Sequence, residues 1–114
     1  MKIVMMTRWN IPCGVSLHAE LVGREWVRMG HDLQVLAPVE WEGYQCDEDE
    51  LYVKRCYTLR NKPVYFFDPR QFLKQDCDVF VVQNLEILPM EDLFRIYPLI
   101  SFCRKTPVSV SGDE

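Results

Sequence analysis

Hydrophobic and polar positions along this chain fall into blocks that predict strands and helices in turn. The apolar run from Ile3 to Met6 predicts a buried strand, and the run from Leu33 to Ala37, ended by Pro38, predicts a second one. Between these runs, apolar residues recur at spacings of four and three, which predicts an amphipathic helix over about 16–29. The stripe consists of Val15, Ala19, Val22, Trp26 and Met29. Ser16 suits the N-cap of this helix, and Gly30 suits the left-handed turn after its end.

The same alternation continues to the end of the chain. Residues 51–59 and 62–67 predict two strands joined by a turn at 60–61, and this pair fits an antiparallel hairpin at the sheet edge. Asp68 and Pro69 suit the N-cap and first position of a short helix that ends near 75. The very apolar run over 78–84 is typical of a central parallel strand that is buried on both faces. Pro89 opens a last helix, which Pro98 should kink, and a strand over 106–111 follows.

Strands and helices that alternate with short connections indicate an α/β fold. We therefore expect a Rossmann-like three-layer α/β/α arrangement with a mainly parallel sheet. A length of 114 residues, 48% of them apolar, is enough for one domain with its own core, so we predict a single domain over 1–114.

An acidic segment interrupts this pattern between residues 40 and 50. It carries six carboxylates and also two aromatic residues, Trp41 and Tyr44. The charge density predicts a solvated, mobile loop. The two aromatic side chains leave a second interpretation open, in which this loop faces an acceptor or a partner protein.

Composition excludes several classes of function. The net charge is −4 and no basic stripe is present, so we expect no nucleic-acid partner. No apolar stretch approaches the length of a secretory leader or a transmembrane helix, which predicts a soluble, cytoplasmic protein. The five cysteines are widely spaced, with no C-x-x-C pair, so we expect reduced thiols and no metal. Cys13 is singled out because it lies in the first loop, where a ligand could meet it.

The loop after the first strand carries the candidate chemistry. It lacks the G-x-G-x-x-G fingerprint of dinucleotide-binding proteins, and the second strand ends in Ala37-Pro38 without a ribose-binding acid. A P-loop motif is also missing from the sequence. What remains is Gly14, directly before the predicted helix, where backbone amides and the helix dipole can hold a diphosphate or a carboxylate.

The order of motifs resembles the amino-terminal half of a GT-B glycosyltransferase of the retaining, sucrose-synthase-like family. Those enzymes begin with an M-K-I-like strand, followed by a loop containing Pro and Gly, a helix, a G-H corner and a V-x-V-L-x-P-like strand. The matching segments are residues 1–4, 12–15, 30–32 and 33–38. Residues 78–84 are similar to the family's D-V-I-H-V-H-like strand, and residues 107–114 to its P-V-V-x-T-x-H-D strand.

The resemblance implies a nucleotide-sugar donor as substrate, no separate cofactor, and a sugar or lipid acceptor, with peripheral membrane contact in the lipid case. It implies that Gly14 approaches the donor diphosphate and that Asn10 and Cys13 line the acceptor side of the cleft. Arg8 and Asn84 would add polar contacts, and Glu86 would lie with Asn84 at the mouth of the cleft. Catalytic residues are not assigned.

Two departures from the family pattern keep a second hypothesis open. Gln83 and Gly112 stand where the family has histidines, and neither residue can act as a general base. The donor-binding domain of the GT-B fold has no counterpart in 114 residues, so we expect a truncated domain that is inactive alone and needs that missing C-terminal domain. The alternative is a non-catalytic Rossmann-like module that binds a protein partner or a small anion.

Overall fold

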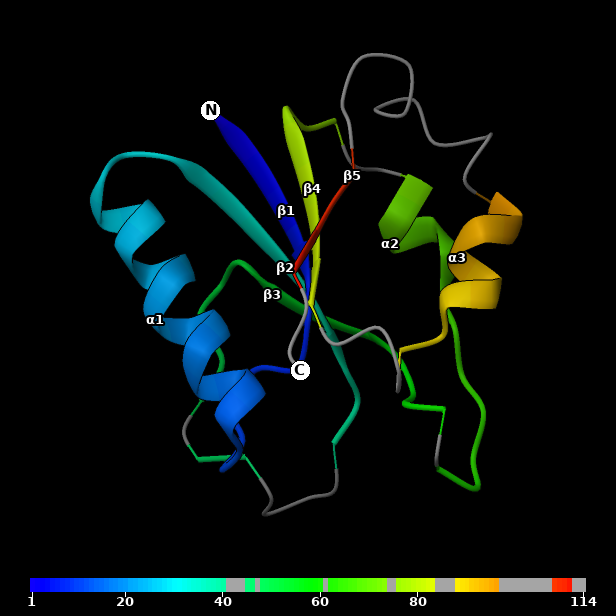
Figure 1. Cartoon of the computed structure of the whole chain (residues 1–114). Coiled ribbons are helices and arrows are strands. Elements are labelled where there is room, and N and C mark those ends of the chain that lie inside the picture. The colour runs from blue at the N-terminus through cyan, green and yellow to red at the C-terminus, as the bar shows by residue number, and fades with distance from the viewer. Residues whose placement is uncertain are drawn as a thin grey trace.

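The fold is a five-stranded parallel sheet with helices on both faces (Figure 1). The computed structural model describes residues 1–40, 45–46, 48–60, 62–73, 76–83, 88–96 and 108–111. The strands are β1 (Lys2–Met6), β2 (Asp32–Pro38), β3 (Val53–Tyr57), β4 (Val79–Gln83) and β5 (Val108–Ser111). The helices are α1 (Gly14–Arg28), α2 (Pro69–Leu73) and α3 (Met90–Ile96). The predicted Rossmann-like α/β class is confirmed.

The strand order is β3-β2-β1-β4-β5, and every pairing is parallel. Met5 pairs with Val35 on one side and Val81 on the other, which places β1 at the centre of the sheet. The chain first builds outward from β1 to β3 and then crosses back to β4, so a topological switch point lies between β1 and β4. Ligands of open α/β sheets bind outside the carboxyl ends of the strands at such a point.

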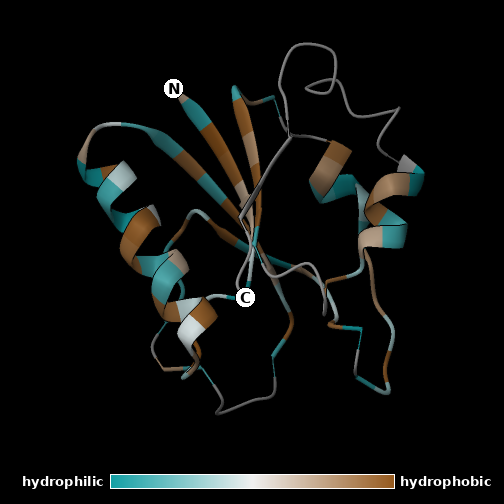
Figure 2. Cartoon of the chain, viewed as in Figure 1, coloured by the Kyte–Doolittle hydropathy of each residue, from teal (hydrophilic) through white to brown (hydrophobic). Residues whose placement is uncertain are grey.

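Two hydrophobic cores lie on opposite faces of the sheet. Because side chains alternate along a strand, Ile3 and Met5 pack toward α1, whereas Val4 and Met6 pack toward α2 and α3. Figure 1 shows α1 on one side of the sheet and the two shorter helices on the other, and Figure 2 shows that β1 and β4 are largely hydrophobic. Burial on both faces explains why these strands appear in the sequence as continuous apolar runs.

Helix α1 begins two residues earlier than expected, and Cys13 rather than Ser16 is its N-cap. The Cys13 backbone is extended, and its Sγ accepts a hydrogen bond from the backbone amide of Ser16 at 3.5 Å. Ser16 is fully buried, and its hydroxyl is committed to Ile11 and Glu20. The helix ends at Arg28, and Gly30 has the predicted left-handed conformation, with φ of 96°.

The antiparallel hairpin expected over 51–67 forms only in part, because no second strand forms over 62–67. β3 pairs in parallel with β2, and the segment after it returns with a single antiparallel bridge, between Tyr57 and Phe67. The Tyr57 ring is fully buried and its hydroxyl donates to the carbonyl oxygen of Leu36, so burial of this aromatic side chain anchors β3 against β2. Residues 62–67 therefore contribute this bridge to the sheet edge and no strand of their own.

The remaining elements match the predicted pattern. Asp68 accepts a hydrogen bond from the backbone amide of Arg70, as expected for the cap of α2, and Glu91 and Asp92 occupy the first turn of α3. β4 lies between β1 and β5, and its four residues from Phe80 to Gln83 are buried. The proposed kink at Pro98 lies outside the described residues.

Candidate functional site

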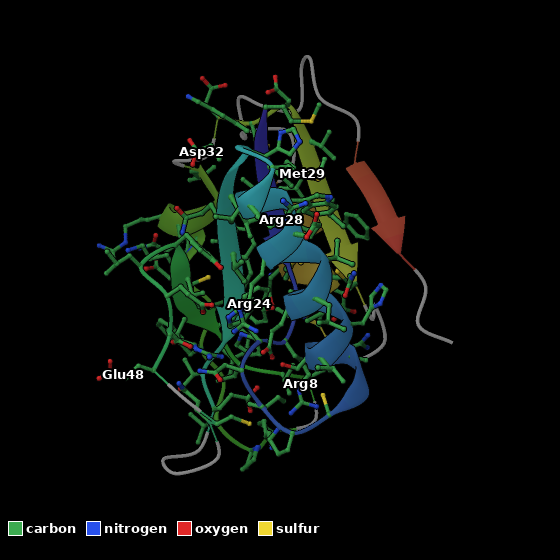
Figure 3. The ribbon with its side chains drawn as sticks, turned by 90° about the vertical axis from the view of Figure 1, so that its left-hand side faces the viewer. Arg8, Arg24, Arg28, Met29, Asp32 and Glu48 are labelled. Atoms are coloured by element: carbon green, nitrogen blue, oxygen red, sulfur yellow. The ribbon has the colours of Figure 1, made fainter. Side chains whose placement is uncertain are left out.

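The candidate site lies at the carboxyl edge of the sheet, where β1 and β2 end and α1 begins. Residues 7–13 connect β1 to α1, and Val39 and Glu40 follow β2 directly. Figure 3 looks onto α1, with Arg8 beside the start of the helix and Arg24 about midway along it.

Gly14, the first residue of α1, is open to its surroundings. A Cβ added at this position meets no described atom within 4 Å, and its φ is not in the left-handed region. Neither packing nor backbone conformation in the described residues therefore requires glycine there. The backbone amides of Gly14 and Val15 donate to no described residue, as expected for the first turn of a helix. This helix start can accept an anionic group from outside.

Asn10 is held inside the loop. Its φ is 64°, a left-handed conformation that asparagine tolerates better than most residues. Its backbone amide donates to Glu20 Oε2 at 2.8 Å, and its side-chain Nδ2 donates to Asp49 Oδ1 at 3.3 Å. The residue is only 2% exposed. Glu20 in turn accepts from the Ser16 hydroxyl at 2.5 Å, so the loop is fastened to the first two turns of α1.

Arg55 on β3 is the hub that joins three segments at this edge. Its Nε and Nη2 donate to the two carboxylate oxygens of Asp49 at 2.9 and 2.7 Å. Nη1 donates to the Pro38 carbonyl oxygen and Nη2 to the Trp9 carbonyl oxygen, each at 2.9 Å. One guanidinium thus ties the ends of β1 and β2 to the acidic segment. A planar fork of five donors is suited to this bidentate arrangement.

A second set of contacts fastens the acidic segment to α1. Trp9, fully buried, donates from Nε1 to Glu50 Oε1 at 3.0 Å, and Arg24 donates from Nε to Glu50 Oε2 at 2.7 Å. The Arg24 guanidinium carbon also lies 5.3 Å from the centre of the Trp9 ring, within range of a cation–π contact. Glu20 is a second acceptor for Arg24, at 3.0 Å.

These contacts shift the pKa values of both acceptor carboxylates. Burial alone would raise the pKa of Asp49, but the hydrogen bonds and charge of Arg55 outweigh it, so the pKa is lowered. Burial likewise opposes the effect on Glu50, where hydrogen bonds from Arg24 and Trp9 lower the pKa. Both carboxylates therefore stay ionised down to lower pH than in an unfolded chain, and the loop is held by ion pairs at neutral pH.

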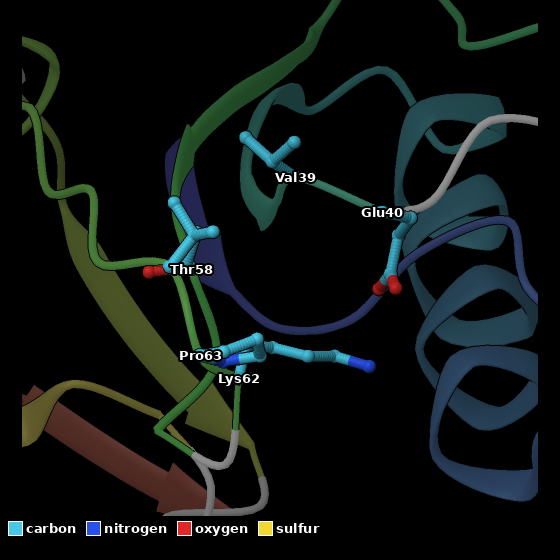
Figure 4. A pocket seen from close by; sticks show the side chains of 6 residues that line it. Val39, Glu40, Thr58, Lys62 and Pro63 are labelled. Carbon is cyan, nitrogen blue, oxygen red and sulfur yellow. The ribbon is translucent and has the colours of Figure 1, made fainter.

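Glu40 differs from its acidic neighbours because its hydrogen-bonding capacity is unmet. Its side chain is 0% exposed, and its Oε2 lies 3.5 Å from Arg8 Nε. Neither carboxylate oxygen, nor Arg8 Nε, has a hydrogen-bond partner among the described residues. Glu40 lines a cavity of about 210 Å³ whose other walls are the side chains of Val39, Thr58, Lys62, Pro63 and Val64 (Figure 4).

The structure thus changes the interpretation of the acidic segment. Glu40, Asp49 and Glu50 do not belong to a solvated loop, because each side chain is buried or paired with an arginine. Arg24 and Arg55 are the cations that pair with Glu50 and Asp49. The sequence alone did not reveal these pairs, because no regular spacing along the chain links the partners. Trp41 and Tyr44, for which a partner-facing role was left open, lie outside the described residues.

The predicted site residues separate into two groups. Cys13 and Gly14 lie together at the start of α1, with Cys13 half-buried. Arg8 is paired with Glu40, and the Asn10 side chain is engaged with Asp49. Asn84 and Glu86 lie outside the described residues. The sequence pattern did not point to Glu40, because an acid was sought at Ala37-Pro38, where the second strand ends. Glu40 lies two residues further along the chain.

Other kinds of site find no support in the described part of the chain. It contains no group of three or more His, Cys, Asp or Glu side chains arranged to hold a metal ion. None of its helices is long and apolar enough to cross a bilayer. Burial raises the pKa of the Cys56 thiol to about 12, so this cysteine is not a nucleophile at neutral pH.

Fold and site together define a small Rossmann-like α/β domain with a helix start and a buried carboxylate at the carboxyl edge of its sheet. No family model matches the chain.

Proposed function

We propose that this chain forms the acceptor-side domain of a GT-B glycosyltransferase, which transfers a sugar from a nucleotide-sugar donor to a sugar or lipid acceptor. The observation that carries the proposal is Gly14. It opens α1 at the carboxyl edge beside the switch point, and nothing described in the protein itself requires a glycine there. A diphosphate that approaches the first-turn amides accounts for its lack of a side chain.

The rigid loop before α1 supports the same proposal. Arg55, Asp49, Glu50 and Glu20 hold residues 9 and 10 in place through hydrogen bonds of 3.3 Å or less. A binding loop that is already ordered loses little conformational freedom when a ligand arrives. In this proposal a second domain closes over the donor, because stabilisation of the transition state requires both walls of the cleft.

The experiment is calorimetric titration of the complete protein, with the second domain that this proposal requires, against UDP- and GDP-sugars, compared with its variant Gly14→Val. Because a Cβ at this position meets no described atom, the variant should fold normally while its side chain blocks the approach of a diphosphate. We expect at least about tenfold weaker binding, since one displaced charge-assisted contact is worth about 1.5–3 kcal/mol. Leu17→Val, at an exposed position less than one turn further along α1, is the matched control and should bind as the parent does.

Failure of every nucleotide-sugar to bind would contradict the proposal, as would a Gly14→Val variant with unchanged affinity. The alternative, a non-catalytic module for a small anion, is favoured by one observation. Gln83 ends β4 with 5% exposure, and a neutral amide cannot serve as a base. In that case pyrophosphate alone should bind as tightly as any nucleotide-sugar.

A further inference from the structure

We propose that the cavity beside Glu40, called the Glu40 cavity below, binds a single sugar ring through two adjacent hydroxyl groups. The starting observation is the unmet hydrogen-bonding capacity of a buried carboxylate. Both oxygens of Glu40 and the Nε of Arg8 lack partners among the described residues. Buried polar groups in folded proteins are almost always satisfied, so a carboxylate left open at a cavity indicates a ligand that completes its hydrogen bonds.

The charges already present determine the charge of that ligand. Arg8 Nε lies 3.5 Å from Glu40 Oε2, which is close enough for the two charges to compensate each other. Lys62 on the cavity wall adds a second cation, so a cationic ligand would increase the net positive charge, whereas an anionic ligand would face the Glu40 carboxylate directly. A neutral ligand avoids both costs.

The unmet groups also determine which functional group the ligand carries. An ionised carboxylate only accepts hydrogen bonds and an ammonium group only donates them. A hydroxyl group does both, so its O–H can donate to Glu40 while its oxygen accepts from Lys62, which also lines the cavity. Two carboxylate oxygens side by side suit two hydroxyls on adjacent carbons. Dinucleotide-binding folds use a carboxylate near the end of the second strand for ribose hydroxyls in the same way.

The walls and size of the Glu40 cavity fit one ring of a sugar. Val39, Pro63 and Val64 offer apolar surface, which suits the C–H face of a furanose or pyranose. The volume of about 210 Å³ is below the range of about 300–1,000 Å³ that is usual for larger ligands. Figure 4 shows the Lys62 side chain reaching across the cavity toward Glu40.

The shared chemistry has two sources, a free sugar and the ribose of a nucleoside. The experiment therefore uses two matched pairs of probes, methyl α-mannoside with its 3-deoxy analogue, and uridine with 2′-deoxyuridine. In each pair the deoxy partner lacks one hydroxyl and keeps no two hydroxyls on adjacent ring carbons. Amide chemical shifts of the ¹⁵N-labelled protein are followed during titration, with the backbone amides of Val39, Glu40 and Thr58 as reporters.

We expect millimolar binding by at least one probe with an adjacent diol, and at least about tenfold weaker binding by its deoxy partner. Glu40→Gln should weaken binding by a similar factor. Because the loss of a buried charge can unfold the protein, a second variant, Val64→Trp, fills the cavity from a position that is 64% exposed. Leu21→Trp, on α1 at the same exposure of 64%, is the control and should leave binding unchanged.

Equal affinities of each diol and its deoxy partner would overturn the inference, as would shifts that persist in Val64→Trp. Absence of binding by all four probes would overturn it as well. Only the role of the ring as an acceptor rests on the proposed function. Binding of a diol probe without binding of any nucleotide-sugar would contradict the proposed function but not the sugar site. Binding of a nucleotide-sugar without binding of any diol probe would contradict the sugar site but not the proposed function.

Discussion

Replacement of Arg55 by methionine is the most direct test of how the edge loop is held. The substitution keeps an unbranched apolar stem but removes four hydrogen bonds of 2.7–2.9 Å. It also leaves the Asp49 carboxylate without its cation, in a position where the two side chains of the pair are 15% and 22% exposed. Loss of one partner of a buried ion pair costs about 3–5 kcal/mol, and partial exposure reduces that figure. We expect a loss of about 2–4 kcal/mol in the free energy of unfolding.

Urea unfolding at pH 7, followed by tryptophan fluorescence, measures this loss. The matched control is Arg28→Met, which breaks the Arg28–Glu25 ion pair on the exposed face of α1, where the side chains are 71% and 50% exposed. Surface pairs contribute little, so the control should change stability by less than about 1 kcal/mol. If the two variants are equally stable, Arg55 is not the hub of this edge and the argument for a rigid loop fails.

Two further predictions concern packing and pH. Gly23→Ala should destabilise the protein by about 1 kcal/mol, because the new methyl meets the buried Trp9 ring at 3.0 Å and overpacking outweighs the gain in helix propensity. Gly14→Ala, which meets no described atom, should cost less than about 0.5 kcal/mol, and a larger loss there would contradict this reasoning. The lowered pKa values of Asp49 and Glu50 mean that their stabilisation is complete above the unfolded pKa of about 4 and is lost at lower pH. Urea midpoints should therefore fall as the pH drops from 5 to 3, and a constant midpoint would be incompatible with these shifts.

Much of the fold could be predicted because its determinants are local. Three features depend only on neighbours within a few residues, and each produced the expected element. They are the helical stripe from Val15 to Trp26, the glycine turn at Gly30 and the Asp68 cap. The runs that became β1 and β4 were recognisable because a strand buried on both faces must be apolar at consecutive positions. These features sufficed for the α/β class and for the position of β4 between two other strands.

The direction of β3 and the place of the acidic residues were not local. A strand of alternating residues can pair in either direction, and β3 was fixed in parallel when Tyr57 was buried and bonded to Leu36. Asp49 was assigned to solvent because its sequence neighbours are charged. Its partners are instead Arg55 on the next strand and Asn10, which is 39 residues away.

The amino-acid sequence by itself therefore determined the order of strands and helices and the glycine at the start of α1, since both depend on spacing along the chain. The tertiary structure alone decided what faces the carboxyl edge of the sheet. There it brought Arg8 to Glu40 and left this buried carboxylate without a hydrogen-bond donor among the described residues. Parallel strands place residues from distant parts of the chain at one edge, and desolvation makes each unmatched group there costly.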